Sequence, residues 1–325
     1  MSTLEDPIYG EYNILDNEVE DEWRRQTSYK DPFIHFKKYD QIMPQMFLDN
    51  SESFHNFETR DDDTWIVSFP KSGSTWLSEL VWCLKNNMDF EKASTIHQSE
   101  RIPFIDLSSL ASKHVGFPDP FELAKAQSSP RIIKTHLSYE MLPPNVMKNK
   151  IKIIYILRNP RDVCVSLHNH LDLFCDYKAS MEEHADYFLR DYCGFYFPFF
   201  SNIRGFIQNK DLPNIHIVTY EEMKEDISLV IDKIVDFLEI PRLDPDHKKK
   251  LMEYISINQM RNNSAVNRKN YTGTGDFINK GIVGNWKTML TDETIKGFEL
   301  WEKTNLEDLD LPINYKTSFT SYEKL

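Results

Sequence analysis

The sequence has few of the features that mark membrane-spanning, secreted or nucleic-acid-binding proteins. No apolar run in its 325 residues approaches the roughly 18 residues that a membrane-spanning helix needs. Its four cysteines show no metal-ligand spacing and suggest no disulfide framework, so we expect free thiols in a reducing compartment, the cytoplasm. The net charge of −13 argues against a nucleic-acid partner. It also means that any anionic ligand must bind to a local basic cluster.

Basic residues are also missing from the N-terminal segment. The first 23 residues contain no lysine or arginine but eight acidic residues. A secretory signal peptide begins with a positively charged region, so this segment does not fit one. Its composition predicts a solvated, partly disordered acidic arm over residues 1–30, followed by a single domain over residues 31–325. With 40% hydrophobic residues, that domain can build a sizeable core.

The segment 64–87 carries the first chemical signal. Residues 65–67 are apolar and predict a strand, and apolar residues at helical spacing follow from Trp76. The turn between them reads Pro-Lys-Ser-Gly-Ser-Thr, in which Gly73 lets the backbone approach a ligand and Ser74 or Thr75 is expected to cap the helix. A helix N-terminus beside one lysine and three hydroxyls can hold a phosphate, although an ordinary turn with a surface lysine has the same sequence. The spacing differs from the G-x-x-x-x-G-K-[ST] pattern of P-loop kinases and NTPases, which argues against that class.

Strands and helices alternate along the chain. Besides the strand of the first segment, strands are predicted at 131–136, 152–158 and 215–220, and helices at 163–173, 181–208, 222–239, 244–260 and 292–304. Gly194 and Pro198 are expected to interrupt the helical stretch at 181–208. This alternation predicts an α/β fold, a single domain with a central, mostly parallel sheet flanked by helices. The continuous apolar run of the strand at 152–158 suits burial on both faces of such a sheet. Residues 31–48 and 100–130 look irregular, and residues 262–285 form a long polar loop of the kind that is often functional.

Several polar residues fall at the ends of these strands, where parallel α/β sheets bind their ligands. Lys134-Thr135-His136 closes the second strand, and a neutral imidazole there can take a proton from a hydroxyl. A structural histidine would have the same sequence. In RNPRDVCVS, Arg158 can grip a phosphate in bidentate fashion, and Ser166 lies two turns into the following helix. An Arg–Asp pair at a helix cap is the alternative interpretation.

The four strings PKSGSTW, KTH, RNPRDVCVS and NKGIVGNWK occur in this order over residues 65–290. Together they resemble the motifs of the cytosolic sulfotransferases, with an invertebrate-type member as the expectation. These enzymes take a sulfuryl group from 3′-phosphoadenosine 5′-phosphosulfate, PAPS, and release 3′-phosphoadenosine 5′-phosphate, PAP. The resemblance implies one α/β domain with a P-loop-like strand-turn-helix site, PAPS as donor and a small hydrophobic alcohol, phenol or steroid as acceptor. It requires no metal.

The resemblance also implies roles for individual residues. Lys71 contacts the bridging and sulfuryl oxygens, Lys134 steadies the transferring group, and His136 deprotonates the acceptor. The residues expected to bind PAPS are Lys71, Ser72, Gly73, Ser74, Thr75, Trp76, Arg158, Ser166, Tyr220, Lys280 and Gly281. Among them Trp76 stacks on the adenine, and Arg158 and Ser166 hold the 3′-phosphate. The usual arginine before Lys280 is replaced by Asn279, which can donate a hydrogen bond but carries no charge.

Two other functions remain open at this point. A relative in the family dehydrates retinol by way of sulfation, so an allylic alcohol as acceptor would lead to elimination. A non-catalytic binder of small molecules or nucleotides is the second alternative, and Asn279 favours it. The acceptor pocket is expected to be apolar, and its candidate walls, each of which suits the core equally well, are Phe33, Phe36, Phe104, Leu107 and His170.

The expected assembly differs from that of the family. Many members dimerise through a segment K-x-x-x-T-V-x-x-x-E, and the corresponding stretch here is KTMLTDETIK. Asp292 replaces the apolar residue and Lys296 replaces the acid. Because a two-fold interface repeats each change, burying the pair of aspartates would be costly. We expect a monomer, or a dimer through a different surface.

Overall fold

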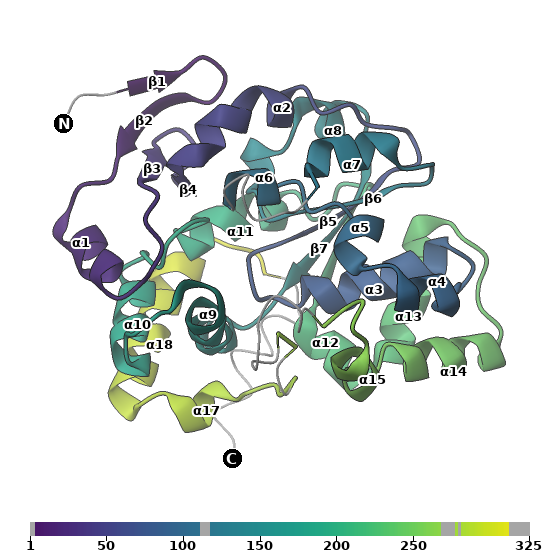
Figure 1. Cartoon of the computed structure of the whole chain (residues 1–325). Helices are drawn as coiled ribbons and strands as arrows, with labels where there is room; N and C mark the ends of the chain where they lie inside the picture. Colours follow the sequence, from purple (N-terminus) through teal and green to yellow (C-terminus); the bar gives the residue numbers. More distant parts are fainter. Residues whose placement is uncertain (1–3, 111–117, 268–276, 279–280, 312–325) are drawn as a thin grey trace.

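The computed structural model describes residues 4–110, 118–267, 277–278 and 281–311, and its strands form an N-terminal sheet and a central sheet (Figure 1). The N-terminal sheet has the order β1-β2-β3-β4 and is antiparallel. Its elements and those that follow it are β1 (Leu4–Asp6), β2 (Gly10–Ile14), α1 (Glu18–Arg25), β3 (Phe33–Phe36), β4 (Gln41–Pro44), the 3-10 helix η1 (Gln45–Asn50) and α2 (Ser51–His55).

The described residues of the acidic N-terminal segment form two strands and a helix, so the expectation of partial disorder is wrong for them. Tyr12 of β2 pairs with Phe36 of β3, and the indole of Trp23 in α1 is fully buried. The acids of this segment have a local function: Glu20 lies in the first turn of α1 and binds Arg24 one turn later. An acid in a first turn is stabilised by the helix dipole. Where the chain divides into an N-terminal part and a domain stays a prediction.

The segment at 31–48 also differs from its expected irregular structure, because it contains β3 and β4. Phe33 pairs with Pro44 at one end of this ladder and Phe36 with Gln41 at the other. Aromatic and branched side chains fit a pleated, half-buried surface, which favours strands here.

The central sheet is parallel throughout and has the order β6-β5-β7-β8, as the alternating pattern predicted. Its strands are β5 (Thr64–Ser68), β6 (Ile132–Thr135), β7 (Lys152–Leu157) and β8 (Ile215–Thr219). In β7, Ile153 and Tyr155 belong to one hydrophobic cluster, and Ile154 and Ile156 belong to the other. Since successive side chains of a strand point to opposite faces, the sheet is buried on both faces.

Helices cover the two faces of this sheet (Figure 1). On the face of Ile154 lie α3, α12, α13 and α14, and on the face of Tyr155 lie α9, α10, α11 and α18. The helices between β5 and β8 are α3 (Ser74–Lys85), α4 (Phe90–Thr95), α5 (Gln98–Arg101), α6 (Leu107–Leu110), α7 (Pro120–Ala126), η2 (Tyr139–Met141), α8 (Pro144–Lys148), α9 (Pro160–Cys175), α10 (Met181–Leu189) and α11 (Phe199–Gln208). Those after β8 are α12 (Tyr220–Glu225), α13 (Ile227–Leu238), α14 (Pro245–Tyr254), α15 (Ile257–Asn262), α17 (Trp286–Met289) and α18 (Asp292–Leu306).

Three of the predicted helical stretches are interrupted. The stretch at 244–260 forms α14 and α15, which are separated at Ile255 and Ser256. The stretch at 222–239 forms α12 and α13, which are separated at Asp226, and the side chain of this residue caps α13. The stretch at 181–208 is broken between α10 and α11, where Gly194 has a positive φ and Pro198 precedes the second helix. The loop-rich prediction for 100–130 missed the short helices α5, α6 and α7.

Candidate active site

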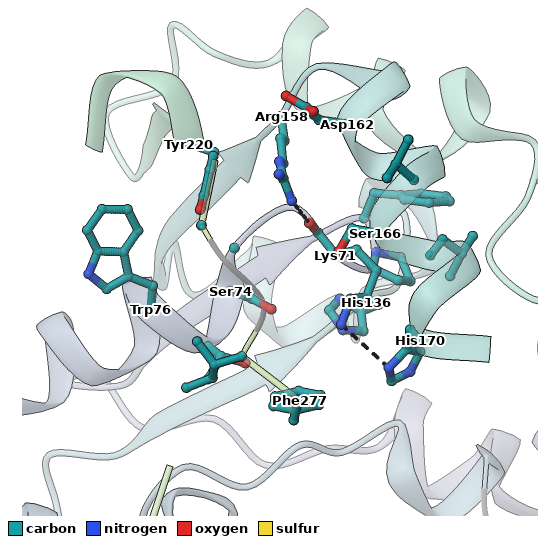
Figure 2. Close-up of a pocket in the computed structure, with 18 of the residues that line it drawn as sticks. Lys71, Ser74, Trp76, His136, Arg158, Asp162, Ser166, His170, Tyr220 and Phe277 are labelled. Carbon is teal, nitrogen blue, oxygen red and sulfur yellow. Dashed lines mark hydrogen bonds between the residues drawn. The ribbon is translucent and has the colours of Figure 1, made fainter. Parts of the chain in front are cut away.

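A cavity of about 200 Å³ opens at the carboxyl ends of β5, β6 and β7. It is lined by most of the residues that the motifs predicted and by two of the candidate pocket walls. These are Lys71, Gly73, Ser74, Thr75, Trp76, Phe104, Lys134, His136, Arg158, Ser166, His170, Tyr220 and Gly281. Figure 2 shows Trp76 and Tyr220 towards one end of the pocket and His136 and His170 towards the other.

The turn between β5 and α3 presents main-chain N–H groups to this cavity. Gly73 is the N-cap of α3, with a φ of 108°, and no side chain caps the helix. The predicted cap by Ser74 or Thr75 is therefore wrong, because the helix begins at Ser74 itself. A Cβ at Gly73 would lie 2.6 Å from Cδ2 of Tyr220, so only glycine fits this turn. The first N–H groups of α3 are thus left to bind a ligand, and the helix dipole favours an anion.

Lys71 lies between the two ends of the pocket and contacts both aromatic and polar groups. Its ammonium nitrogen is 3.4 Å from Nδ1 of His170 and 4.7 Å from the ring centroid of Phe277. An ammonium group can only donate, so Nδ1 of His170 accepts and its proton lies on Nε2. Figure 2 shows this contact as a dashed line. His170 and Phe277 therefore hold the ammonium group of Lys71 within the cavity.

His136 has its tautomer determined by the backbone of β5. Its Nδ1 is 2.6 Å from the carbonyl oxygen of Ser68 and 3.1 Å from the hydroxyl of the same residue. A carbonyl oxygen can only accept, so Nδ1 carries the proton and the lone pair of the neutral ring is on Nε2. The side chain is 8% exposed and lines the cavity. In the neutral ring, this is the tautomer that a general base acting through Nε2 needs.

The second lysine of the motif lies next to the histidine on β6. The ammonium nitrogen of Lys134 is 5.2 Å from the ring centroid of Phe104, and Phe104 forms an isolated parallel bridge with the backbone of Lys134. The ring of Phe104 packs edge-on against that of His136 at a centroid distance of 4.9 Å. Phe104 therefore borders both groups that the resemblance assigns to the transfer step.

Arg158 connects the two loops that the motifs assign to phosphate binding. Its guanidinium donates to the main-chain oxygens of Lys71 at 3.1 Å and Ile282 at 3.5 Å. The same group lies 4.3 Å from the ring centroid of Tyr220, a cation–π contact. This arrangement holds the arginine between the turn after β5 and the loop before α17.

Asp162 also holds the loop before α17 in place. This buried residue of α9 accepts hydrogen bonds from the N–H groups of Gly284 at 2.7 Å and Trp286 at 3.3 Å. A carboxylate that accepts two main-chain N–H groups makes a strong, charge-assisted contact. The Arg–Asp string of the third motif therefore links α9 to the fourth motif.

Some predicted site residues lie elsewhere. Phe33 and Phe36 are fully buried in the core, where Phe33 stacks on Tyr29 at 5.3 Å, so the structure does not support them as pocket walls. Leu107 begins α6 but stays outside the cavity lining, and Leu110, one helical turn later, lines it instead. Ser72 is 1% exposed and is also outside the lining. Lys280 and Asn279 lie outside the described residues.

The lining also contains residues that the motifs did not indicate. They are chiefly Phe69, Cys193, Phe195, Tyr196 and Phe277. Phe277 comes from the long polar loop, and an isolated aromatic residue in such a loop was the one signal that could have indicated it. Phe195 and Tyr196 follow the glycine that breaks the helical pattern at 181–208, and aromatic side chains next to a break can face a pocket.

The lining fits a nucleotide that carries phosphates at two positions. Beside Gly73, a second close approach of the backbone occurs at Gly281, where a Cβ would lie 2.8 Å from Ile257 and 3.4 Å from the hydroxyl of Tyr220. Arg158 supplies a guanidinium, and α3 supplies uncapped N–H groups. Among the described residues no group of His, Cys, Asp and Glu side chains is arranged to hold a metal ion.

Comparison with known proteins assigns the chain to a family. The model of the sulfotransferase domain matches residues 61–310. The chain is 32% identical over 283 residues to luciferin sulfotransferase of Photinus pyralis, and the match covers 80% of this chain and 76% of that protein. It is 30% identical over 273 residues to sulfotransferase 1B1 of Canis lupus familiaris, with 82% and 90% covered. The chain belongs to the sulfotransferase family and is a PAPS-dependent transferase of the cytosolic type.

Solved structures agree with this assignment. Retinol dehydratase in complex with androsterone and the inactive cofactor PAP has a TM-score of 0.84 and 25% sequence identity, with 95% of this chain and 99% of that chain covered. Retinol dehydratase in complex with retinol and PAP has a TM-score of 0.83 and 26% identity, with 93% and 98% covered. The α/β fold predicted from the sequence is therefore confirmed. None of the helices in the described part of the chain is long and apolar enough to cross a membrane.

Proposed function

We propose that the enzyme transfers the sulfuryl group of PAPS to the hydroxyl of a small hydrophobic acceptor, with His136 as general base. The observation that carries this proposal is the hydrogen bond from Nδ1 of His136 to the carbonyl of Ser68, which leaves Nε2 to accept a proton in a cavity that Lys134 also lines. His136 takes the acceptor proton on Nε2 as the acceptor oxygen bonds to sulfur. The bond between sulfur and the bridging phosphate oxygen breaks, and PAP leaves.

The charges around this reaction support the assignment. Charge moves onto the phosphate that leaves, and preorganised cations and N–H groups aimed at such charge supply the largest share of catalysis in many enzymes. Lys71, Lys134 and the N-terminus of α3 all border the same cavity. Lys71 and Lys134 are therefore proposed to stabilise the transferring group and the phosphate that leaves, and His136 is the base.

The donor end of the cavity is proposed to bind PAPS through two sets of groups. Ser74, Thr75 and the N–H groups of α3 face the 5′-phosphosulfate, and Arg158 with Ser166 faces the 3′-phosphate. Trp76 and Tyr220, whose rings lie 5.7 Å apart, border the adenine. Ile257 stands near them, so this part of the site is aliphatic as well as aromatic.

The acceptor end is proposed to select a hydrophobic molecule. Its walls are aromatic and aliphatic, and they include Phe69, Phe104, Leu171, Phe195 and Phe277. Apolar walls with a few directed polar groups are typical of small-molecule pockets. His170, which the sequence suggested as a wall, and His136 are polar groups at this end. Luciferin sulfotransferase and the complexes of retinol dehydratase with androsterone or retinol support this class of acceptor.

A panel of acceptors tests the proposal. Labelled PAPS is incubated with the enzyme and simple phenols, steroid alcohols, retinol and a hydrophilic sugar alcohol as the control. We expect label on one or more hydrophobic acceptors and none on the sugar alcohol. The likeness to retinol dehydratase makes elimination the second candidate, and mass analysis distinguishes a sulfated product from an alkene with free sulfate. PAP binding without transfer to any acceptor would contradict the proposal and indicate a non-catalytic binder.

We also propose that the enzyme is a monomer, or a dimer through a surface other than the family segment. Thr291 caps α18 by accepting from the N–H of Thr294, and Asp292 lies in the first turn, where the helix dipole favours an acid. The exposed Asp292 and Lys296 thus suit a solvated helix end.

The cytoplasm is the proposed compartment, and the buried free thiols of Cys83 and Cys164 suit its reducing conditions.

Light scattering at moderate salt checks the proposed assembly. We expect the mass of a monomer at micromolar concentration, because the acid and the lysine in this segment oppose a two-fold contact. If a dimer forms, Lys296→Trp should leave it intact, and Lys303→Trp on the same helix is the matched control. A dimer that dissociates with Lys296→Trp but not with Lys303→Trp would contradict the proposal.

A further inference from the structure

Asp106 is a fully buried carboxylate beside the catalytic base, and none of the four motifs contains it. It follows a short segment that extends the central sheet: Lys134 donates its N–H to the oxygen of Pro103 at 2.9 Å, and Ile105 donates its N–H to the oxygen of Lys134 at 3.1 Å. This pairing places Asp106 next to the end of β6. Backbone hydrogen bonds of the neighbouring residues therefore fix the main chain at Asp106, independently of the contacts of its carboxylate.

Three donors share the two oxygens of Asp106. Oδ1 accepts from the hydroxyl of Thr135 at 2.5 Å, and Oδ2 accepts from the N–H of His136 at 2.7 Å and from the hydroxyl of Tyr196 at 2.7 Å. Burial raises the pKa of the Asp106 carboxyl to about 6, against the hydrogen bonds from Thr135, Tyr196 and His136, which lower it. A neutral side chain would avoid this cost of burial. Residues that are energetically unfavourable for folding, such as a buried carboxylate, are found most often at functional sites.

The contacts of Asp106 surround the imidazole of His136. The ring of Tyr196 packs edge-on against this imidazole, with centroids 5.6 Å apart, and its hydroxyl is held by Asp106. Phe104, two residues before Asp106, packs against the same imidazole at 4.9 Å. The carboxylate thus joins the main chain of the base to one aromatic neighbour, and the segment that carries it supplies the other.

We propose that Asp106 is a positioning residue, which holds the main chain of His136 and the ring of Tyr196 so that the imidazole keeps its reactive orientation. The proposal rests on the role of His136 in the proposed function. Asp106 does not border the donor end of the cavity, so its effect should appear in kcat and leave PAP binding unchanged. Small displacements of a catalytic group can cost about 100-fold in rate.

The test uses Asp106→Asn, with Asp63→Asn as the matched control. Asparagine keeps the shape but replaces an accepting oxygen with a donating NH₂. Either the hydroxyl of Thr135, or both the N–H of His136 and the hydroxyl of Tyr196, then face an NH₂ in place of an accepting oxygen. Asp63 is equally buried and binds Arg131 at 2.6 Å before β6, at the opposite end of the sheet from the cavity. We expect Asp106→Asn to lower kcat about 10- to 100-fold with the Kd of PAP unchanged. Asp63→Asn should keep the wild-type kcat per PAP-binding molecule.

A double-mutant cycle separates positioning from a general structural effect. If Asp106 acts through His136, Asp106→Asn should cause no further loss in the His136→Ala background, because coupled residues give non-additive losses. A wild-type kcat in Asp106→Asn, or an equal further loss in the His136→Ala background, would overturn the proposal. If Asp106→Asn does not fold, Tyr196→Phe removes one of its three donors and keeps the ring, and it should lower kcat in the same coupled manner.

A measurement that needs no turnover distinguishes failure of the proposed role of Asp106 from failure of the proposed function. The Nδ1 proton of His136 donates to Ser68, so it should give a slowly exchanging downfield resonance in the NMR spectrum of the PAP complex, assigned by its loss in His136→Ala. Asp106→Asn should speed its exchange with water, and Asp63→Asn should not. Unchanged exchange would overturn the role of Asp106 even if no acceptor is sulfated. Faster exchange without any sulfation would contradict only the proposed function.

Discussion

His136→Ala is expected to lower kcat by about 10²–10⁴-fold, the usual range for loss of a general base. The affinity for PAP should remain close to that of the wild type, because His136 lies at the acceptor end of the cavity, away from Trp76 and Tyr220. The expected loss follows from the position of the lone pair, which the carbonyl of Ser68 fixes on Nε2. Steady-state kinetics with labelled PAPS and calorimetric titration with PAP measure the two quantities.

The matched control for this variant is His35→Ala. His35 is a histidine of β3 that pairs with Asp40 at 2.9 Å and does not line the cavity. The His35→Ala variant should keep the wild-type kcat. A near-normal kcat in His136→Ala would show that another group takes the acceptor proton.

Arg158→Ala is expected to narrow the preference for PAPS over adenosine 5′-phosphosulfate, which lacks the 3′-phosphate. Hydrogen bonds to charged groups contribute about 1.5–3 kcal/mol, so kcat/KM for PAPS should fall roughly 10- to 150-fold. The value for adenosine 5′-phosphosulfate should fall much less. Arg158→Lys should lie between, because a lysine keeps the charge but cannot make the bidentate contact.

The ratio of kcat/KM for the two donors measures this effect in each variant. Arg204→Ala is the control, because this arginine pairs with Asp308 on the surface and should leave the ratio unchanged. The substitution at Arg158 also removes the hydrogen bond to the oxygen of Lys71, so some loss with both donors is expected. Equal use of the two donors by the wild-type enzyme would show that the third motif does not bind a 3′-phosphate.

The central sheet and the meeting of the motif residues in one cavity were predictable because their signals are local. A continuous apolar run such as 153–157 identifies a strand buried on both faces, and the polar residues that follow each strand meet at one edge. The order of four motifs then indicated the family. The N-terminal sheet was not predictable in this way. Tyr12 pairs with Phe36, and the sequence of neither segment indicates a partner so far away along the chain.

The acceptor end was predicted less well, for two physical reasons. A phenylalanine suits a pocket wall and a core equally, so Phe33 and Phe104 could not be told apart from the sequence although only Phe104 lines the cavity. In the short helix α6 the choice between Leu107 and Leu110 depends on helical phase, which four residues do not define. Asp106 gave no signal because its partners lie 29, 30 and 90 residues away along the chain.

A single-turnover experiment tests the central claim most directly. The wild-type enzyme and His136→Ala are each loaded with labelled PAPS to the same occupancy and mixed with an excess of an acceptor from the panel. The account predicts that the wild type moves the label to the acceptor hydroxyl, one label for each PAP formed. In His136→Ala the label should stay on the nucleotide over the same time. Transfer at the same rate by both proteins, or by neither with any acceptor, would contradict the account.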